Sequence, residues 1–161
     1  MDLKQFLELF SPNPGNRYLQ VTDKFDETTT ALENILNEVD GELHLVCYGE
    51  QETLHDNFKT SIQYIKNLKT PFRALPREHN NVIFKNILHL HDNPELLLRI
   101  AYTTLANNAN IIIMQDKHSM QIEEMKSLLE KFEFRSANSI DLLKEFDLII
   151  AKKMHMWGNG L

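Results

Sequence analysis

Apolar residues along this chain follow two different spacings, and the spacing changes back and forth several times. Short runs of apolar residues predict strands, and apolar residues recurring every three or four positions predict helices. Runs such as Ile111–Ile113 are apolar on both faces, so the alternation predicts a largely parallel sheet with helices on each side. The predicted strands are residues 17–21, 42–49, 72–75, 81–88, 110–116, 134–139 and 146–154, and the predicted helices are residues 2–10, about 26–39, 54–68 and 119–132, with another beginning at Pro94.

Local signals mark some of these boundaries. Asn93 suits the cap of the helix that begins at Pro94, and Glu95 complements its dipole. The last two strands are joined by residues 140–145, a connection that is short for a crossover helix. They are therefore expected to form an antiparallel pair at one edge of the sheet.

Composition narrows the class of protein. A chain of 161 residues is expected to form a single domain over residues 1–161, with a short helix at its start. Its net charge of −6 makes nucleic acid and anionic membranes poor partners. No apolar run approaches the roughly 20 residues that cross a bilayer, and the acidic, amphipathic start is not expected to be a targeting peptide. The single cysteine, Cys47, favours a buried thiol over a reactive one and a reducing, cytoplasmic location.

Residues 22–27, "TDKFDE", join the first predicted strand to the next helix. Many α/β proteins keep a glycine-rich cofactor loop there, because glycine lets the backbone turn tightly and approach a ligand. This segment has no glycine and three acids, which cap a helix well but repel a pyrophosphate. NAD, FAD and ATP are therefore not expected to bind here.

The order of elements, together with three segments, carries a resemblance to a known family. "NNVIFKNILHLHDNPELLLRIAYTTLANNANIIIMQD" follows a strand, "L-H-H-x-x-D-P-E", helix, strand pattern through Leu88, His89, Asp92, Pro94 and Glu95. "MKSLLEKFEF" and "FDLIIAKKM" are similar to the helix-to-strand segment and last strand of that family. Residues 17–154 thus resemble class I S-adenosylmethionine-dependent methyltransferases. The resemblance implies an α/β, Rossmann-like three-layer sandwich with a mostly parallel seven-stranded sheet and a terminal antiparallel strand pair.

The resemblance also suggests site residues. Thr22 and Asp23 stand where the family has its "D-x-G-x-G-x-G" loop, and Glu50 stands where an acid binds the cofactor ribose. The adenine position, residues 75–77, lacks the usual acid. S-adenosylmethionine is thus a cofactor that this chain either binds or has lost. His89 and His118 are the candidate general bases.

Two further features leave alternatives open. His89, His91 and Asp92 have the residue types of a zinc site, although the family pattern already accounts for His89. Met154, Met156 and Trp157 are expected either to pack on the terminal strand or to form a self-association contact in a homodimer.

Three functions follow from these observations. The first is a degenerate methyltransferase-like domain acting as a binding or scaffold module, favoured by the missing glycine loop. The second is an active methyltransferase for a small molecule or a protein. The third is a metal-dependent hydrolase using the histidines of residues 89–91 and Asp92.

Overall fold

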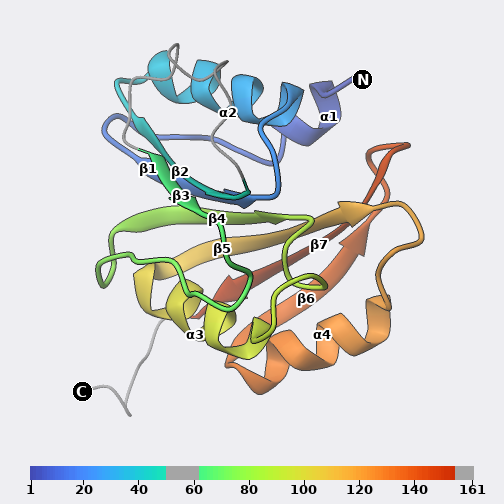
Figure 1. Cartoon of the computed structure of the whole chain (residues 1–161). Coiled ribbons are helices and arrows are strands. Elements are labelled where there is room, and N and C mark those ends of the chain that lie inside the picture. Colours follow the sequence, from blue (N-terminus) through green and yellow to red (C-terminus); the bar gives the residue numbers. More distant parts are fainter. Residues whose placement is uncertain (50–61, 155–161) are drawn as a thin grey trace.

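The architecture is known from a computed structural model, which describes residues 1–49 and 62–154. Seven strands in these residues form one sheet in the order β3-β2-β1-β4-β5-β7-β6 (Figure 1). The helices and strands are α1 (Lys4–Leu7), β1 (Arg17–Thr22), α2 (Glu27–Asn37), β2 (Glu42–Tyr48), β3 (Ile62–Ile65), β4 (His79–Lys85), α3 (Pro94–Thr104), β5 (Leu105–Asp116), α4 (Ile122–Lys131), β6 (Phe134–Ile140) and β7 (Phe146–Lys153).

Strands β1 to β5 run parallel, and β7 is antiparallel to both β5 and β6. This confirms the predicted α/β sheet with a terminal antiparallel pair. The chain returns from β6 and inserts β7 between β5 and β6, so β6 rather than β7 forms the outer edge. The connection between these strands is too short to hold a crossover helix.

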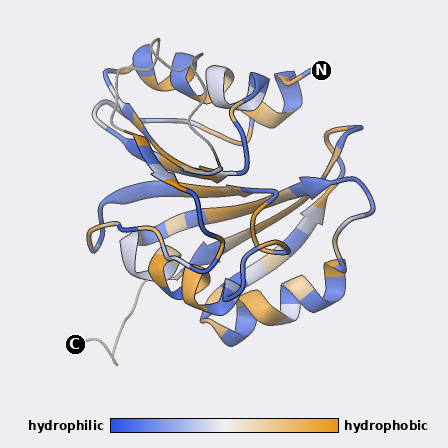
Figure 2. Ribbon diagram, viewed as in Figure 1, coloured by the Kyte–Doolittle hydropathy of each residue, from blue (hydrophilic) through white to orange (hydrophobic). Residues whose placement is uncertain are grey.

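Helices cover both faces of the sheet. Figure 1 shows α1 and α2 on one face and α3 and α4 on the other, which makes three layers. The side chains of Ile111 and Ile113 pack in the core under α3 and α4, and that of Ile112 packs in the core under α1 and α2. All three are fully buried, as their consecutive apolar pattern predicts. Figure 2 shows hydrophobic residues concentrated in the central strands, between helices that carry both hydrophobic and hydrophilic residues.

Polar residues at the helix starts behave as predicted. Asn93 accepts a hydrogen bond from the Leu96 amide, and Pro94 is the first residue of α3. Asp26 caps α2 through the Thr28 amide, and the Thr29 hydroxyl accepts from the Asp26 amide in return. None of the described helices is long and apolar enough to cross a membrane.

The predicted helix over residues 54–68 is wrong for its second half. Residues 62–65 form β3, which pairs in parallel with residues 45–48 of β2. The apolar residues at positions 62 and 65 have a spacing that also fits a helix. In the fold, however, pairing with β2 supplies hydrogen-bond partners for the backbone of these residues, and Ile and Tyr are favoured in strands. Residues 54–61 lie outside the described part of the chain.

The weak strand predicted at residues 72–75 does not form. The side-chain amide of Gln63 donates to the Arg73 carbonyl at 2.7 Å and accepts from the Arg73 amide at 3.0 Å. A side chain of β3 therefore takes the hydrogen bonds that a neighbouring strand would have made. Phe72 is nevertheless buried, which explains its apolar pattern. The N-terminal helix is also shorter than predicted, at Lys4–Leu7.

Candidate functional site

The carboxyl ends of β1, β4 and β5 meet at one edge of the sheet. Thr22, the last residue of β1, pairs with Lys85 of β4, which pairs with Met114 of β5. The strand order reverses between β1 and β4, because β2 and β3 lie on one side and β5 on the other. Ligands of open α/β sheets bind at the carboxyl ends of the strands at such a point. This edge is therefore the candidate functional site.

A buried lysine occupies this edge. Lys85 has no exposed surface, and its ammonium lies 3.1 Å from Asp23 Oδ1 and 3.2 Å from Asp26 Oδ2. The Phe146 ring, at the start of β7, lies 6.0 Å from the same ammonium. The two carboxylates supply the charge that a buried ammonium requires. The acids of the loop after β1 therefore bind the chain's own lysine.

The loop after β1 is closed by contacts within itself. The Thr22 hydroxyl donates to the Lys24 carbonyl at 2.7 Å, and Thr22 is fully buried. Asp26 caps α2, so amides at this helix start already have acceptors. Phe25 packs against the core under α2, with its ring centroid 6.3 Å from that of Tyr64 on β3. The loop positions where the resembling family has glycine thus carry side chains engaged in packing and capping.

A second polar pair joins the ends of β4 and β5. Asn86 donates to Asp116 Oδ1 at 3.0 Å, and the Asp116 amide donates back to Asn86 Oδ1 at 2.8 Å. Asn86 is buried and has a φ of 57°, a left-handed conformation that asparagine tolerates better than most residues. These reciprocal bonds fix the turn that follows Lys85.

The predicted site residues are only partly brought together. Thr22 and Asp23 lie at this edge, and their polar groups contact Lys24 and Lys85 as described above. His89 and His118 follow β4 and β5 and are both exposed. The His118 amide donates to Asp147 at 3.0 Å, which anchors its backbone. Glu50, the predicted ribose-binding acid, lies outside the described residues.

The histidines near residue 90 do not offer a ready metal site. His91 is buried, its Nε2 donates to the Thr70 carbonyl at 3.0 Å, and its Nδ1 accepts from the Asn93 amide at 2.9 Å. Both ring nitrogens are therefore engaged, and His91 has no lone pair left for a metal. Asp92 is exposed beside it. The geometry does not support the hydrolase hypothesis.

Sequence reasoning missed Lys85 as the central residue of this edge. The available signal was a single lysine inside the apolar run "NVIFKNIL", near the end of a predicted strand. Lysine is almost never fully buried unless it is paired. That position, together with the acids Asp23 and Asp26 after the first predicted strand, would have suggested an ion pair between neighbouring strand ends.

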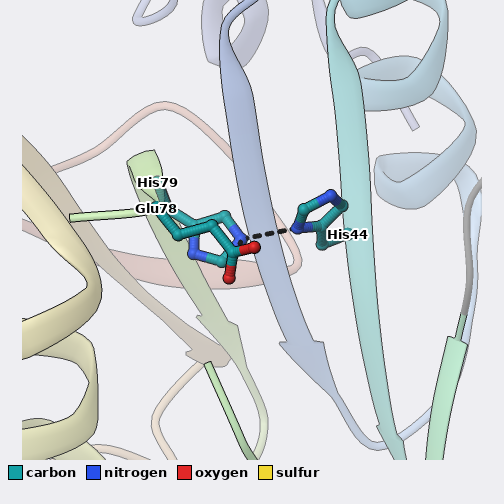
Figure 3. A group of neighbouring side chains, drawn as sticks. All are labelled: His44, Glu78 and His79. Atoms are coloured by element: carbon teal, nitrogen blue, oxygen red, sulfur yellow. Dashed lines mark hydrogen bonds and ion pairs between the residues drawn. The ribbon is translucent and has the colours of Figure 1, made fainter. Parts of the chain in front are cut away.

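A different polar group lies toward the amino ends of the strands. His44 of β2, His79 at the start of β4 and Glu78 just before it face one another on the sheet surface, across β1 (Figure 3). Burial lowers the pKa of His79 to about 4, and the nearby His44 adds to the lowering. The His79 ring is therefore neutral at pH 7.

Comparisons with known proteins identify the class of fold. A scan against models of protein families finds no match, and a search of curated proteins finds no relative. Solved structures do match. A SAM-dependent methyltransferase from Aquifex aeolicus aligns at a TM-score of 0.76 with 14% identity, covering 95% of this chain and 90% of that one. A methyltransferase from Mesorhizobium loti aligns at 0.69 with 11% identity, covering 93% and 97%.

Other matching structures are longer proteins. Phosphoethanolamine N-methyltransferase 2 from Haemonchus contortus, in complex with S-adenosyl-L-methionine, aligns at a TM-score of 0.69 with 10% identity. The match covers 93% of this chain but only 51% of that protein. Together with the strand order, these similarities define a class I S-adenosylmethionine-dependent methyltransferase-like fold. The chain accordingly has a methyltransferase-like α/β fold.

Proposed function

We propose that this domain has lost methyl transfer and serves as a binding or scaffold module. The observation that carries the proposal is the Lys85 ammonium, buried between Asp23 and Asp26 at the loop after β1. A site that binds a ligand keeps polar groups directed toward it. Here these groups bind one another instead.

Charge supports this proposal. S-adenosylmethionine carries a sulfonium, an ammonium and a carboxylate, so its net charge is positive, and acids beside the sulfonium attract it more when no lysine neutralises them. Lys85 neutralises one of the two negative charges that Asp23 and Asp26 bring to this edge. In a partly buried site such a fixed cation is screened little by salt. The attraction for the cofactor is correspondingly reduced.

Sterics support the same conclusion. The resembling family places glycines in this loop so that the backbone can approach the cofactor without a Cβ in the way. Lys24 and Phe25 stand in the corresponding segment, and the Phe25 ring is fixed in contact with the core under α2. Opening this loop for a ligand would require moving Phe25 out of its packing.

The test is direct binding of S-adenosylmethionine and of its demethylated product to the purified chain. We expect no saturable heat in calorimetry and no rise in melting temperature at millimolar ligand. Binding at micromolar concentration that is lost in Glu50→Ala but kept in the neighbouring Glu52→Ala would overturn the proposal.

That opposite result would favour the alternative, an active methyltransferase for a small molecule or a protein. The alternative is supported by the strand order and by the matching Haemonchus contortus enzyme, whose structure holds S-adenosyl-L-methionine. His89 and His118, exposed beyond β4 and β5, would then be the candidate bases. The test compares transfer of a labelled methyl group by the wild type with transfer by His89→Gln and by His118→Gln. A lower rate in either variant would indicate that this histidine acts as the base.

The proposed scaffold role includes self-association and a cytoplasmic location. Met154, the residue after β7, is 44% exposed, and methionine is enriched at protein interfaces. Met156 and Trp157, which are predicted to join it, lie outside the described residues. Cys47, the single cysteine of the chain, is buried, which suits a reducing compartment. Sedimentation velocity over a hundredfold concentration range tests the homodimer, and we expect Met154→Ser to weaken it. A sedimentation coefficient that stays that of a monomer would remove self-association from the proposal.

A further inference from the structure

His44, Glu78 and His79 form a cluster far along the strands from Lys85. His44 lies early in β2, and His79 is the first residue of β4, so their side chains meet over β1, which runs between them (Figure 3). His44 Nδ1 is 2.8 Å from His79 Nε2, and Glu78 Oε1 is 3.9 Å from the same nitrogen. One ligand atom from each residue lies within 4.8 Å of the others.

The outer contacts of the two rings fix where their protons lie. The Thr104 hydroxyl donates its one proton to the Leu75 carbonyl at 2.7 Å, so it must accept from His79 Nδ1, which lies 2.8 Å away. On the other side, His44 Nε2 lies 3.0 Å from Glu42 Oε2, and an ionised carboxylate can only accept. His79 therefore carries its proton on Nδ1, and His44 carries one on Nε2.

This assignment leaves two lone pairs pointing at each other. With those protons in place, neutral His44 has its lone pair on Nδ1 and neutral His79 has its lone pair on Nε2, and these are the two atoms 2.8 Å apart. The Glu78 carboxylate adds a third electron donor beside them. The two facing lone pairs require a positive charge between them, supplied either by an extra proton or by a metal ion, and Glu78, whose Oε1 also accepts from the Leu75 amide at 3.1 Å, favours that charge.

We propose that a divalent transition metal ion of the zinc type occupies this point, bound by His44 Nδ1, His79 Nε2 and the Glu78 carboxylate. Two imidazoles and a carboxylate suit zinc, whereas calcium and magnesium prefer oxygen ligands alone. Three protein ligands leave one tetrahedral position for water. The ion would tie β2 to the start of β4 across β1.

The surroundings match what metal-bound histidines need. Such histidines donate their second N–H to a carboxylate or another oxygen, which fixes the ring and its tautomer. Glu42 is placed to do this for His44, and Thr104 does so for His79. Thr104 is in turn held by the Leu75 carbonyl. Glu42 lies two residues before His44 on β2 and Thr104 is the last residue of α3, so each ligand ring has an outer partner.

The geometry needs only a small adjustment. Zinc–nitrogen bonds of about 2.0–2.1 Å place two tetrahedral nitrogen ligands roughly 3.3 Å apart. The rings would therefore separate by about half an ångström from their 2.8 Å contact. His79 is 1% exposed, whereas the His44 side chain is 24% exposed and has solvent on one side, so we expect His44 to make most of this adjustment. The same exposed side gives the ion a path into the site.

The experiment uses the full chain, stripped with EDTA and then freed of chelator. Zn²⁺ is titrated in by calorimetry, with Mg²⁺ as the comparison ion, and melting temperatures are recorded with and without zinc. We expect one zinc per chain and a clear rise in melting temperature, with no response to magnesium. His44→Gln and Glu78→Gln should each weaken binding at least a hundredfold, and the outer variant Glu42→Gln about ten- to a hundredfold.

Control variants separate this site from other histidines. His89→Gln and His118→Gln remove exposed imidazoles elsewhere and should leave the affinity unchanged, as should a variant lacking both His55 and His155. Circular dichroism verifies that every variant is folded, and ¹⁵N spectra of the imidazoles report the ligand atoms directly. We expect zinc to shift His44 Nδ1 and His79 Nε2.

Three outcomes would overturn the proposal. They are the lack of a one-to-one zinc complex, binding that changes less than threefold in both His44→Gln and Glu78→Gln, and spectra in which His44 Nδ1 stays protonated in excess zinc. The last would show that a proton, and not a metal, joins the two rings. None of these results depends on binding of S-adenosylmethionine at the other end of the strands.

Discussion

The Lys85 ammonium lies 3.1 Å from Asp23 Oδ1 and joins the end of β4 to the loop after β1. Asp26 completes the arrangement at 3.2 Å, and it also caps α2. One side chain thus links a central strand, a loop and a helix start at the edge where this fold places ligands. Lys85 is fully buried, and the two aspartates are 28% and 21% exposed.

Replacing Lys85 by methionine should destabilise the domain by about 3 kcal/mol, because two neighbouring carboxylates lose the cation between them. Urea unfolding measures the free energy of unfolding. Lys117→Met is the matched control, since Lys117 also lies between two aspartates, Asp141 and Asp147, but is 32% exposed. An exposed pair contributes at most about 1 kcal/mol. Equal losses in the two variants would contradict the buried ion pair.

Replacing Asn93 by alanine should destabilise the domain by about 1 kcal/mol, because the Leu96 amide loses its acceptor at the start of α3. Asn34→Ala provides the comparison within a helix. Asn34 is an exposed interior residue of α2, where alanine is the better helix former and should be neutral or stabilising by a few tenths of a kcal/mol. Thermal unfolding measures the stability of both variants. A similar change in stability at the two positions would argue against capping by Asn93.

Gly41 and Gly15 should respond differently to substitution. A Cβ at Gly41 would lie 2.7 Å from the Asn16 carbonyl oxygen and 2.9 Å from Leu36 Cδ2, whereas Gly15 has open space but a φ of 76°. Gly41→Ala is expected to cost about 1–3 kcal/mol through crowding. Gly15→Ala should cost about 1 kcal/mol through backbone strain. Asparagine should be accepted better than alanine at Gly15 and worse at Gly41, which unfolding in urea will show.

The stability of the domain should fall above pH 10 partly because of Tyr48. Burial raises the pKa of this phenol above its ordinary value of 10.0, against a smaller lowering by a hydrogen bond from the Phe72 backbone. The unfolded chain therefore releases this proton first as pH rises, and the stability present below pH 10 is progressively lost above it.

Tyr48→Phe isolates this contribution. The hydroxyl donates to the Thr70 carbonyl at 2.7 Å, so its removal should cost about 1 kcal/mol at pH 7. The variant should also lose less stability than the wild type between pH 9 and pH 11 in urea unfolding. Parallel pH profiles for the two proteins would show that Tyr48 keeps an ordinary pKa in the native state.

Much of the sheet could be predicted from local patterns. The segments that became β1, β2, β4, β5, β6 and β7 were recognisable because their core-facing positions carry apolar residues, and Asn93 marks the start of its helix by its capping side chain. The residues of β3 could not be recognised, since their spacing also fits a helix and only pairing with β2 decides the matter. The same holds for residues 72–75, whose ladder bonds are taken by Gln63.

The sequence by itself determined the class of fold, the caps of α2 and α3, and the missing glycines after β1, because these depend on residues close together in the chain. Only the tertiary structure decided which acids meet Lys85, 62 positions from Asp23, and which histidines meet across β1, with His44 and His79 35 positions apart. Such meetings depend on strand order and register. Strand order and register cannot be deduced from the spacing of residues that are close in the chain. The side chains that meet at the two ends of the sheet could therefore be identified only from the tertiary structure.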